Sequence, residues 1–566
     1  MSQSQPIISF KDFSFKYKTQ QEATLKHLDL DIFPGEKVLI LGPSGSGKTT
    51  LVKCINGLIP NQDKGIISGK CVINGKEINH TSIFQRGNDV GTVLQDSDAQ
   101  FVGLSVGEDI AFYLENKNVP LHDMQPKVTK AAEIVGLDSF LSSLPFDLSG
   151  GQKQRTSIAG ILHGNAPILL FDEPLAALNP SMSESIVDLI DQLNHQEHKT
   201  VVIVEHRFEE VLHKEIDKIV LLNEGQIVKI GKPDDFLKDD ILEKYGIRNP
   251  LYLDALRKVS GNLKQDHDLW NVDLINPSDY QSDFQKFLNN RSSQPNRLTQ
   301  KDAKDIIDVA DLRYSYDGQH QVINMAHLNI KRGEKISIIG KNGSGKSTFA
   351  KLLTGILRPT TGDILELGKS IKHQTIQQIG QQMAYIMQDP NKMIVKDTVE
   401  DEVGLALQLR GISGSELSDR VAESLKVTDL YTMRHWPVNA LSYGQKKRLT
   451  VASLLVLNPA CLIMDEPTAG QDFEHYQRMM AFVDQVIEKK QMTLIVITHD
   501  MQLALEHTNR AIVIDQGTVI ADDDPFKVLN DKWIVRQAGL RQTSIYRLAE
   551  RIGVSGESLA RASINV

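Results

Sequence analysis

Two glycine-rich stretches of the chain have the form G-x-x-x-x-G-K-[ST], which is typical of a phosphate-binding loop. In such a loop glycines let backbone N–H groups surround phosphate oxygens, the lysine reaches the outer phosphates, and the next hydroxyl ligates Mg²⁺. One match could be a coincidental turn, but two matches at corresponding places are not. We predict two nucleotide-binding loops, made of Gly42, Pro43, Ser44, Gly45, Ser46, Gly47, Lys48, Thr49 and Thr50, and of Gly340, Lys341, Asn342, Gly343, Ser344, Gly345, Lys346, Ser347 and Thr348.

Two Asp-Glu pairs end strongly apolar segments, PILLFDEP and ACLIMDEP. Carboxylates at the carboxyl end of a parallel strand lie where such sheets bind ligands. The first acid of each pair is expected to hold Mg²⁺ and the second to polarise an attacking water. A solvated acidic turn is the competing interpretation. The predicted metal ligands in these two motifs are Thr49, Asp172, Ser347 and Asp465, and the predicted catalytic acids are Glu173 and Glu466.

A Ser-Gly turn that opens a helix also occurs twice, as LSGGQKQR at 148–155 and as LSYGQKKR at 441–448. A hydroxyl and backbone N–H groups at a helix start can hold an anion, although an ordinary helix cap has the same pattern. The candidate residues are Ser149, Gly150, Gly151 and Gln152, and Ser442, Tyr443, Gly444 and Gln445. Tyr443 stands where the first copy has a glycine.

These motifs belong to an internal repeat. The same interval of 293 residues separates Gln95 from Gln388, and His206 from His499. We therefore predict two homologous domains, 1–250 and 301–566. The segment 251–300 between them is expected to begin with a helix, LYLDALRKV, that closes the first domain. Its NPSDY and NNRSSQPNR stretches are typical of an exposed connection.

Each half places an apolar segment before its phosphate loop, EKVLIL or EKISII, and a helical segment after it. Further apolar segments, TVVIV and TLIVI, precede the two histidines. Apolar strands that alternate with helices favour a mostly parallel sheet covered on both faces, which is an α/β fold.

The composition limits the function. The chain has 566 residues, a net charge of -9 and only three cysteines, which gives no basic excess for nucleic acid, with a local basic patch left open, and no disulfide framework. The N-terminus lacks a basic segment before an apolar run, and every apolar stretch is shorter than the ~20 residues of a membrane span. We expect a protein of the reducing cytoplasm that does not cross a membrane by itself.

The order of the motifs, from phosphate loop through glutamine, LSGGQ-type signature and Asp-Glu pair to histidine, resembles the ATP-binding cassette (ABC) ATPases over nearly the whole chain. The resemblance implies two tandem P-loop NTPase domains, each with a helical subdomain that carries the signature. In that family two cassettes face head to tail, and each ATP lies between one phosphate loop and the opposite signature. One chain would then supply both halves.

The resemblance also implies roles for single residues. Tyr17 and Tyr316 would stack on adenine, although a strand tyrosine in the core is the competing interpretation. Gln95 and Gln388 would contact Mg²⁺, and His206 and His499 would contact the γ-phosphate. Asn179 and Asp472 lie where the family usually has Asp. Because Tyr443 adds a side chain at the first composite site, we expect that site to turn over more slowly.

The segments 94–116 and 387–411 resemble those of the ATPases of energy-coupling-factor (ECF) transporters. This implies an importer for a vitamin, its precursor or a metal ion, with the chain on the cytoplasmic face of the membrane. Its partners would be an integral-membrane coupling subunit of the T-component type and a membrane substrate-binding subunit. The predicted coupling face, for which a solvated acidic helix start is the alternative, consists of Glu108, Asp109, Glu400, Asp401 and Glu402.

Fused cassettes also occur in soluble ATPases that act on ribosomes, and we keep this as the alternative function. Those proteins typically carry a longer, charged, helical linker. The segment 249–300 contains six Lys or Arg and six Asp, with NPSDY and SSQPN interrupting any helix, which argues against a ribosome-binding arm. A DNA-processing ATPase would need a long insertion between Gln95 and Ser149, and that interval is too short.

Overall fold

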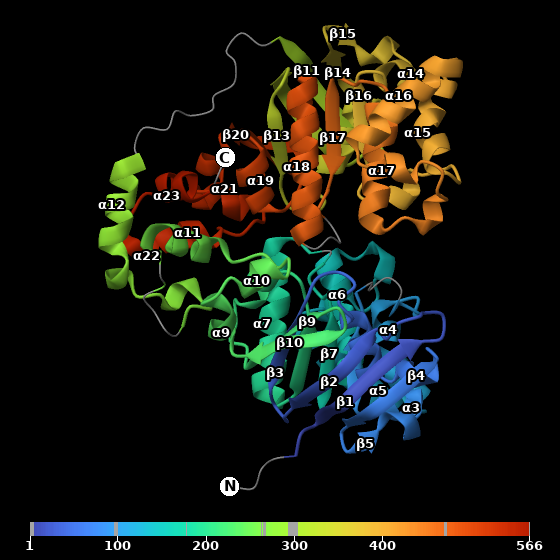
Figure 1. The fold of residues 1–566 in the computed structure, drawn as a ribbon, viewed down its shortest axis with the longest axis vertical. Helices are drawn as coiled ribbons and strands as arrows, with labels where there is room; N and C mark the ends of the chain where they lie inside the picture. The colour runs from blue at the N-terminus through green and yellow to red at the C-terminus, as the bar shows by residue number, and fades with distance from the viewer. Residues whose placement is uncertain are drawn as a thin grey trace. The chain divides into compact units, whose positions relative to one another are not determined.

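The computed structural model describes residues 5–95, 100–176, 178–261, 263, 268–291, 304–468 and 473–564. The chain forms two compact units, Met1–Asp279 and Tyr280–Val566 (Figure 1). Each unit contains one copy of the repeat. We describe each unit by itself.

A six-stranded sheet with the order β10-β9-β3-β8-β7-β6 forms the centre of the first unit. Its four inner pairings are parallel, and only the edge strand β10 runs antiparallel to β9. Strands β3, β7 and β8 are buried along their whole length, as expected for a parallel sheet covered on both faces. The strands are β3 (Lys37–Leu41), β6 (Val90–Val93), β7 (Ile168–Asp172), β8 (Thr200–Val204), β9 (Lys218–Asn223) and β10 (Gln226–Gly231).

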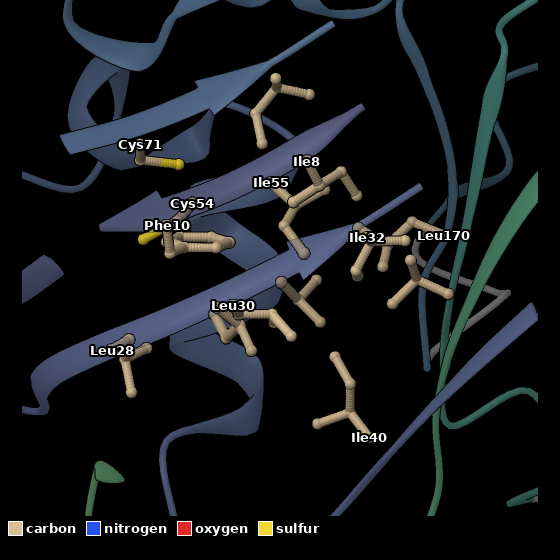
Figure 2. Packing of buried hydrophobic residues seen from close by; sticks show 14 of the residues in the cluster. Ile8, Phe10, Leu28, Leu30, Ile32, Ile40, Cys54, Ile55, Cys71 and Leu170 are labelled. Atoms are coloured by element: carbon tan, nitrogen blue, oxygen red, sulfur yellow. The ribbon is translucent and has the colours of Figure 1, made fainter. Parts of the chain in front are cut away.

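A second, antiparallel sheet, which the sequence analysis did not predict, has the order β2-β1-β4-β5. It consists of β1 (Ile8–Tyr17), β2 (Leu25–Ile32), β4 (Gly65–Ile73) and β5 (Lys76–Glu77). Figure 2 shows its buried side chains, among them Phe10 and Leu30, packing toward Cys54 and Ile55 of helix α1 (Lys48–Ile55) and toward Leu170 of β7. This shared core fixes the helix that follows the first phosphate loop.

The predicted helical subdomain of the first unit is formed by α4 (Val106–Asn116), α5 (Leu121–Val135) and α6 (Gly150–Leu162), which contact one another. Helix α6 begins at the signature. The remaining helices before the closing segment are α2 (Leu58–Asn61), α3 (Ile83–Arg86), α7 (Pro180–Glu197) and α8 (Phe208–Val211).

The second unit repeats this arrangement, with sheet orders β16-β17-β18-β13-β19-β20 and β12-β11-β14-β15. Its strands are β11 (Asp305–Ser315), β12 (Gln321–Lys331), β13 (Lys335–Ile339), β14 (Thr361–Glu366), β15 (Lys369–Ser370), β16 (Met383–Ile386), β17 (Cys461–Asp465), β18 (Thr493–Ile497), β19 (Arg510–Asp515) and β20 (Thr518–Asp523). Its helices up to the last strands are α13 (Lys346–Leu353), α14 (Ile376–Ile379), α15 (Val399–Gln408), α16 (Gly414–Val427), α17 (Tyr443–Leu455), α18 (Phe473–Lys490) and α19 (Met501–His507).

The segment expected to connect the domains is more ordered than the sequence suggested. The predicted closing helix is present as α11 (Leu251–Ser260), after α9 (Pro233–Leu237) and α10 (Ile241–Lys244). Beyond it, however, Leu269 and Ile275 are fully buried in the first unit. The expectation of an exposed connection is therefore wrong for this part, where apolar side chains are buried, while residues 292–300 of the NNRSSQPNR stretch and its surroundings lie outside the described residues.

The second unit takes up the rest of this segment. Helix α12 (Gln281–Arg291) contacts α23 (Gly556–Ser563), and Tyr280 and Phe284 are fully buried. The other helices at this end of the unit are α20 (Pro525–Val528), α21 (Lys532–Gln537) and α22 (Ser544–Ile552). The unit boundary therefore falls inside the predicted linker, between Asp279 and Tyr280.

Glu366, at the end of β14, is a buried carboxylate that makes the second unit sensitive to pH. It is 4% exposed, and neither of its oxygens has a hydrogen-bond partner among the described residues. Burial raises its pKa to about 7. A pKa raised above that of the unfolded chain means that the folded state binds the proton more tightly, so this contribution to stability is lost as pH rises through about 7.

We therefore expect the free energy of unfolding of the second unit to fall by ~1.4 kcal/mol between about pH 6 and about pH 8.5 because of Glu366. The Glu366→Gln variant should lack this part of the pH dependence. Urea unfolding of both proteins at the two pH values measures the difference. Glu366→Ile, which copies Ile73 at the matching position of the first unit, is the apolar control. An identical pH dependence in all three proteins would contradict the prediction.

Candidate nucleotide-binding sites

The two phosphate loops follow the carboxyl ends of β3 and β13, and each leads into a helix, α1 or α13. Gly42 and Gly340 have no room for a side chain, because a Cβ atom would lie 2.3 Å from the carbonyl oxygen of Leu222 and 2.2 Å from that of Ile514. Gly47, with φ of 104°, adopts a left-handed conformation at the start of α1 that favours glycine. Contacts within the protein therefore fix the backbone conformation of both loops.

Each loop encloses its lysine. Lys48 Nζ donates hydrogen bonds to the carbonyl oxygens of Gly42 (2.7 Å) and Pro43 (2.9 Å). Lys346 Nζ makes the same two bonds, at 2.8 Å each, to Gly340 and Lys341. Both lysines are buried, which places one positive charge inside each loop.

Several polar groups of the loops suit a phosphate ligand. The hydroxyls of Ser46 and Ser344 are buried and have no hydrogen-bond partner among the described residues. No side chain caps the start of α1 or α13, so the first N–H groups of each helix are open to an anion. These orphaned donors, together with Lys48 and Lys346, fit the phosphates of a nucleotide.

The acidic pair of the first unit lies at the end of β7. Burial, and then the charge of Glu173, raises the pKa of Asp172 to about 6. Burial also acts to raise the pKa of Glu173, but the neighbouring His206 and Lys48 outweigh it and the pKa lies below its usual value. Glu173 is therefore ionised at neutral pH. Its Oε2 accepts a hydrogen bond from Gln95 Nε2 (2.7 Å) and lies 3.7 Å from His206 Nδ1.

In the second unit the corresponding acidic pair and histidine have different hydrogen-bond partners. His499 Nδ1 lies 2.8 Å from Glu466 Oε1. The hydroxyl of Tyr385, on β16, donates a hydrogen bond of 2.8 Å to Asp465 Oδ2. The sequence analysis missed Tyr385, because Thr92 at the matching position of the first unit gave no repeated signal. Burial raises the pKa of Asp465, against the effect of the Tyr385 and Ser347 hydroxyls.

Both glutamates that are predicted to be catalytic have strained backbones. Glu173 has φ of 50° and Glu466 has φ of 46°, in the left-handed region that residues other than glycine, Asn and Asp rarely occupy. Residues held in this conformation cluster at active sites, where the surrounding structure offsets the cost. Each of the two glutamates lies beside the histidine of its own unit, His206 or His499.

The two tyrosines expected at adenine lie beside the phosphate loops. The Tyr17 hydroxyl is 3.3 Å from Thr50 Oγ1, and the Tyr316 hydroxyl is 3.1 Å from Thr348 Oγ1. The Tyr17 ring packs against the core of the first unit, whereas Tyr316 is exposed. Stacking on adenine stays a prediction for both residues.

The signature residues cap helices α6 and α17. Gln152 N donates to Ser149 Oγ, and Ser149 N donates to Gln152 Oε1 (2.9 Å). Ser442 and Gln445 form the same reciprocal pair. The helix-cap interpretation is therefore correct locally, and the role of the signature at a phosphate of the opposite cassette stays a prediction. Tyr443 is half-exposed, and its hydroxyl donates to the backbone carbonyl of Gln388 (3.4 Å).

The turn after the first Asp-Glu pair ends at Asn179, which departs from the usual Asp. Its side-chain oxygen accepts a hydrogen bond from Met182 N (2.9 Å) and caps α7. An asparagine does this as well as an aspartate. The matching Asp472 lies outside the described residues.

The acidic residues of the predicted coupling face have internal partners in the first unit. Asp109 Oδ1 accepts hydrogen bonds from Val102 N (2.8 Å) and Gly103 N (2.9 Å), and Glu108 Oε2 accepts one from Leu104 N (2.7 Å). These carboxylates fix the loop before α4. That loop in turn exposes Val102 and Leu104, which are 64% and 78% exposed.

The second unit follows the same design. Glu402 is buried and accepts hydrogen bonds from Val395 N (2.9 Å) and Lys396 N (2.7 Å). Asp401 accepts a bond from Thr398, and Glu400 pairs with His435 (2.9 Å). The acidic residues therefore bond to the backbone or side chains of their own unit, while Glu108 and Asp401 stay exposed, and the coupling face stays a prediction. The second loop also exposes an apolar side chain, Val395, next to the exposed Lys396 and Asp397.

Beside the loop that precedes α4, the first unit has a cavity of about 300 Å³. It lies between α4, α6 and β6, and its lining includes Gly91, Asp109, Tyr113 and Gly160. The small residues on β6 and α6 leave space that larger side chains would fill.

Comparison with known proteins identifies the family. Residues 25–176 and 323–469 each match the family model described as ABC transporter, and residues 239–314 match a model described as ATP-binding cassette cobalt transporter. An ABC transporter ATP-binding protein of Clostridium perfringens is 46% identical over 543 residues, which cover 96% of this chain and 95% of that protein. A protein of the same description from Lactiplantibacillus plantarum is 45% identical over 547 residues, or 97% and 96% of the two chains.

Among solved structures, cbiO1 of Clostridium perfringens, described as part of the ABC transporter complex cbiONQ, is 32% identical. It covers 44% of this chain and 100% of that one, with a TM-score of 0.39.

The chain belongs to the ABC transporter family of ATP-binding proteins. More particularly, it is a fused pair of cassettes, because the family match occurs once in each half. The predicted α/β fold with two tandem cassettes is confirmed. In the described part of the chain, no helix combines the length and apolar character that crossing a membrane requires.

Proposed function

We propose that the chain hydrolyses ATP to drive an ECF-type membrane importer for a vitamin, its precursor or a metal ion. The observation that carries this proposal is the presence, in each unit, of a complete set consisting of phosphate loop, buried lysine, Asp-Glu pair, histidine and signature. Support for the transport role comes from the match of residues 239–314 to a cobalt-transporter family and from relatives described as transporter ATPases. The ribosomal alternative has no comparable support.

The residues of each unit fit ATP with Mg²⁺. Thr49, Asp172 and Gln95 would hold the metal in the first unit, and Ser347, Asp465 and Gln388 in the second. Bound Mg²⁺ would neutralise charge on the phosphate oxygens. Lys48 and Lys346 are placed to exchange their carbonyl partners for phosphate oxygens, which are stronger acceptors for an ammonium group.

Hydrolysis needs a base for the attacking water. Ionised Glu173 is suited to accept a proton, and its contact with His206 orients the carboxylate. Glu466 with His499 is the corresponding pair. The histidines would contact the γ-phosphate, so that loss of this phosphate changes the surroundings of the glutamate.

Two units in one chain allow ATP to act across them. In the proposed mechanism each ATP binds a phosphate loop of one unit and the signature of the other. ATP binding closes the pair and hydrolysis reopens it. Charge-assisted hydrogen bonds of ~1.5–3 kcal/mol each would supply the ~5.5 kcal/mol needed to reverse a 99:1 equilibrium.

The chain would act at the cytoplasmic face of the membrane, bound to an integral-membrane coupling subunit that works with a membrane substrate-binding subunit. We propose that the exposed apolar loops, with Val102 and Leu104 in the first unit and Val395 in the second, receive the coupling subunit. This revises the predicted acidic face, because the acids hold these loops in place.

Affinity purification of the full chain from detergent-solubilised membranes tests this role. We expect integral-membrane proteins to co-purify in fixed stoichiometry and to change the ATPase rate. The Val102→Asp/Leu104→Asp variant should bind these membrane proteins at least ~10-fold more weakly, since a buried charge in an apolar contact costs several kcal/mol. Ile66→Asp, at an exposed apolar position on β4, is the matched control and should retain it. Recovery of the chain with ribosomes and without membrane proteins would contradict the proposal.

A further inference from the structure

The loop after the catalytic glutamate is fixed in a different way in each unit. In the second unit, Lys447 Nζ donates a hydrogen bond of 2.7 Å to the carbonyl oxygen of Pro467, the residue that follows Glu466. Lys447 is buried and belongs to α17, the helix that begins at the signature. A side chain of the helical subdomain thus bonds directly to the backbone beside the catalytic group.

The first unit has no such bond at the matching position. Gln154 stands there, also buried, and its amide nitrogen has no hydrogen-bond partner among the residues that the structure describes. Its shorter side chain does not reach the carbonyl of Pro174.

In the first unit two residues that follow strand β8 hold this loop instead. Glu205, which is fully buried at the end of β8, accepts a hydrogen bond from Leu175 N (2.9 Å). Arg207 donates to the carbonyl oxygens of Ala176 and Leu178, at 3.3 Å each. Thr498 occupies the place of Glu205 in the second unit, and Asp500, in the place of Arg207, caps α19.

Helix α17 has further contacts with the nucleotide side of its own unit. The Lys447 ammonium lies 5.2 Å from the centre of the Tyr443 ring, and the Tyr443 hydroxyl donates to the Gln388 carbonyl. Lys446 Nζ donates to Asn391 Oδ1 (3.1 Å). The first two turns of α17 therefore contact both the glutamine segment and the loop after Glu466.

We infer that Lys447 is a positioning residue for hydrolysis in the second unit. By bonding to Pro467 it makes the placement of Glu466 depend on the position of the signature helix. A shift of the helical subdomain then changes the rate of hydrolysis at Glu466, whereas the loop after Glu173 is held by Glu205 and Arg207, which follow β8. This inference rests on the proposed ATPase activity.

The test uses the full chain carrying Glu173→Gln, so that only Glu466 supports turnover. Adding Lys447→Gln should lower kcat about 10-fold or more, because small displacements of a catalytic group are costly. The KM for ATP and the melting temperature should stay unchanged, since glutamine is accepted in the same buried place of the first unit. Lys447→Arg, which keeps a donor long enough to reach the carbonyl, should retain kcat within about 3-fold.

Gln154→Met in the Glu466→Gln chain is the matched control and should leave kcat unchanged. An unchanged kcat in the Lys447→Gln chain would overturn the inference. So would a parallel loss of kcat, ATP affinity and thermal stability without rescue by Lys447→Arg, because that pattern indicates packing alone. If neither the wild-type chain nor the Glu173→Gln chain hydrolyses ATP, the proposed function fails, and the inference fails with it.

Discussion

Replacing Glu173 and Glu466 together by glutamine is expected to lower the ATPase kcat by about 100-fold or more while ATP still binds. General base catalysis contributes ~10²–10⁴-fold, and each glutamate is the carboxylate that meets the histidine in its unit. The phosphate loops do not depend on these side chains, so affinity for ATP should persist. Steady-state phosphate release and equilibrium nucleotide binding measure the two quantities.

The two single variants should differ. Tyr443 stands in the signature that would complete the first site, so we expect Glu173→Gln to retain more activity than Glu466→Gln. Asp147→Asn, in the turn just before the first signature, is a control that keeps both glutamates. Equal residual activity of the two single variants would contradict the predicted asymmetry, and full activity of the double variant would contradict the catalytic assignment.

Lys346→Met is expected to weaken ATP binding at the second site by about 30-fold or more, because removing one partner of a buried charged interaction costs ~2–5 kcal/mol. The Lys346 ammonium is already inside the loop on two carbonyl oxygens, so little of the chain has to rearrange to present it to phosphate. Lys48→Met should do the same at the first site.

Calorimetric titration of the full chain with ATP and Mg²⁺ gives the stoichiometry and the affinity of each site. We expect wild type to bind two nucleotides, and each single variant to keep one site of normal affinity. Lys372→Met, at an exposed position of the second unit, is the control and should keep two. Two sites of normal affinity in the Lys346→Met protein would show that this loop does not bind the phosphates.

Sequence alone located the groups whose chemistry depends on local spacing. The phosphate loops, the Asp-Glu pairs and the signature lie where strands end and helices begin, and their recurrence in both halves excluded coincidence. The strained backbone of Glu173 and Glu466 leaves no signal in sequence, because φ near 50° at a glutamate depends on the surrounding structure.

The contacts that differ between the halves could not be predicted. Tyr385 and Lys447 contact the Asp-Glu region of the second unit, but Thr92 and Gln154 stand at the matching positions. A comparison of the two repeats identifies only residues that occur in both halves, so it does not identify Tyr385 and Lys447. Their function depends on distances between segments far apart in the chain.

The hydrogen-bond partners of the acidic helix starts could not be predicted for a related reason. Periodicity places Asp109 and Glu402 near the first turn of a helix, but it does not show that the preceding loop folds back to donate its N–H groups to them. In the same way, composition suggested that the segment after the closing helix is exposed, although apolar residues in its described part, such as Tyr280 and Phe284, are buried.

The central claim is that each ATP is shared between the two units. The most direct test is a structure of the Glu173→Gln/Glu466→Gln chain with ATP and Mg²⁺. We predict one ATP between the loop of Lys48 and Ser442, and a second between the loop of Lys346 and Ser149. A nucleotide that contacts residues of one unit only, with the opposite signature left in solvent, would contradict the account.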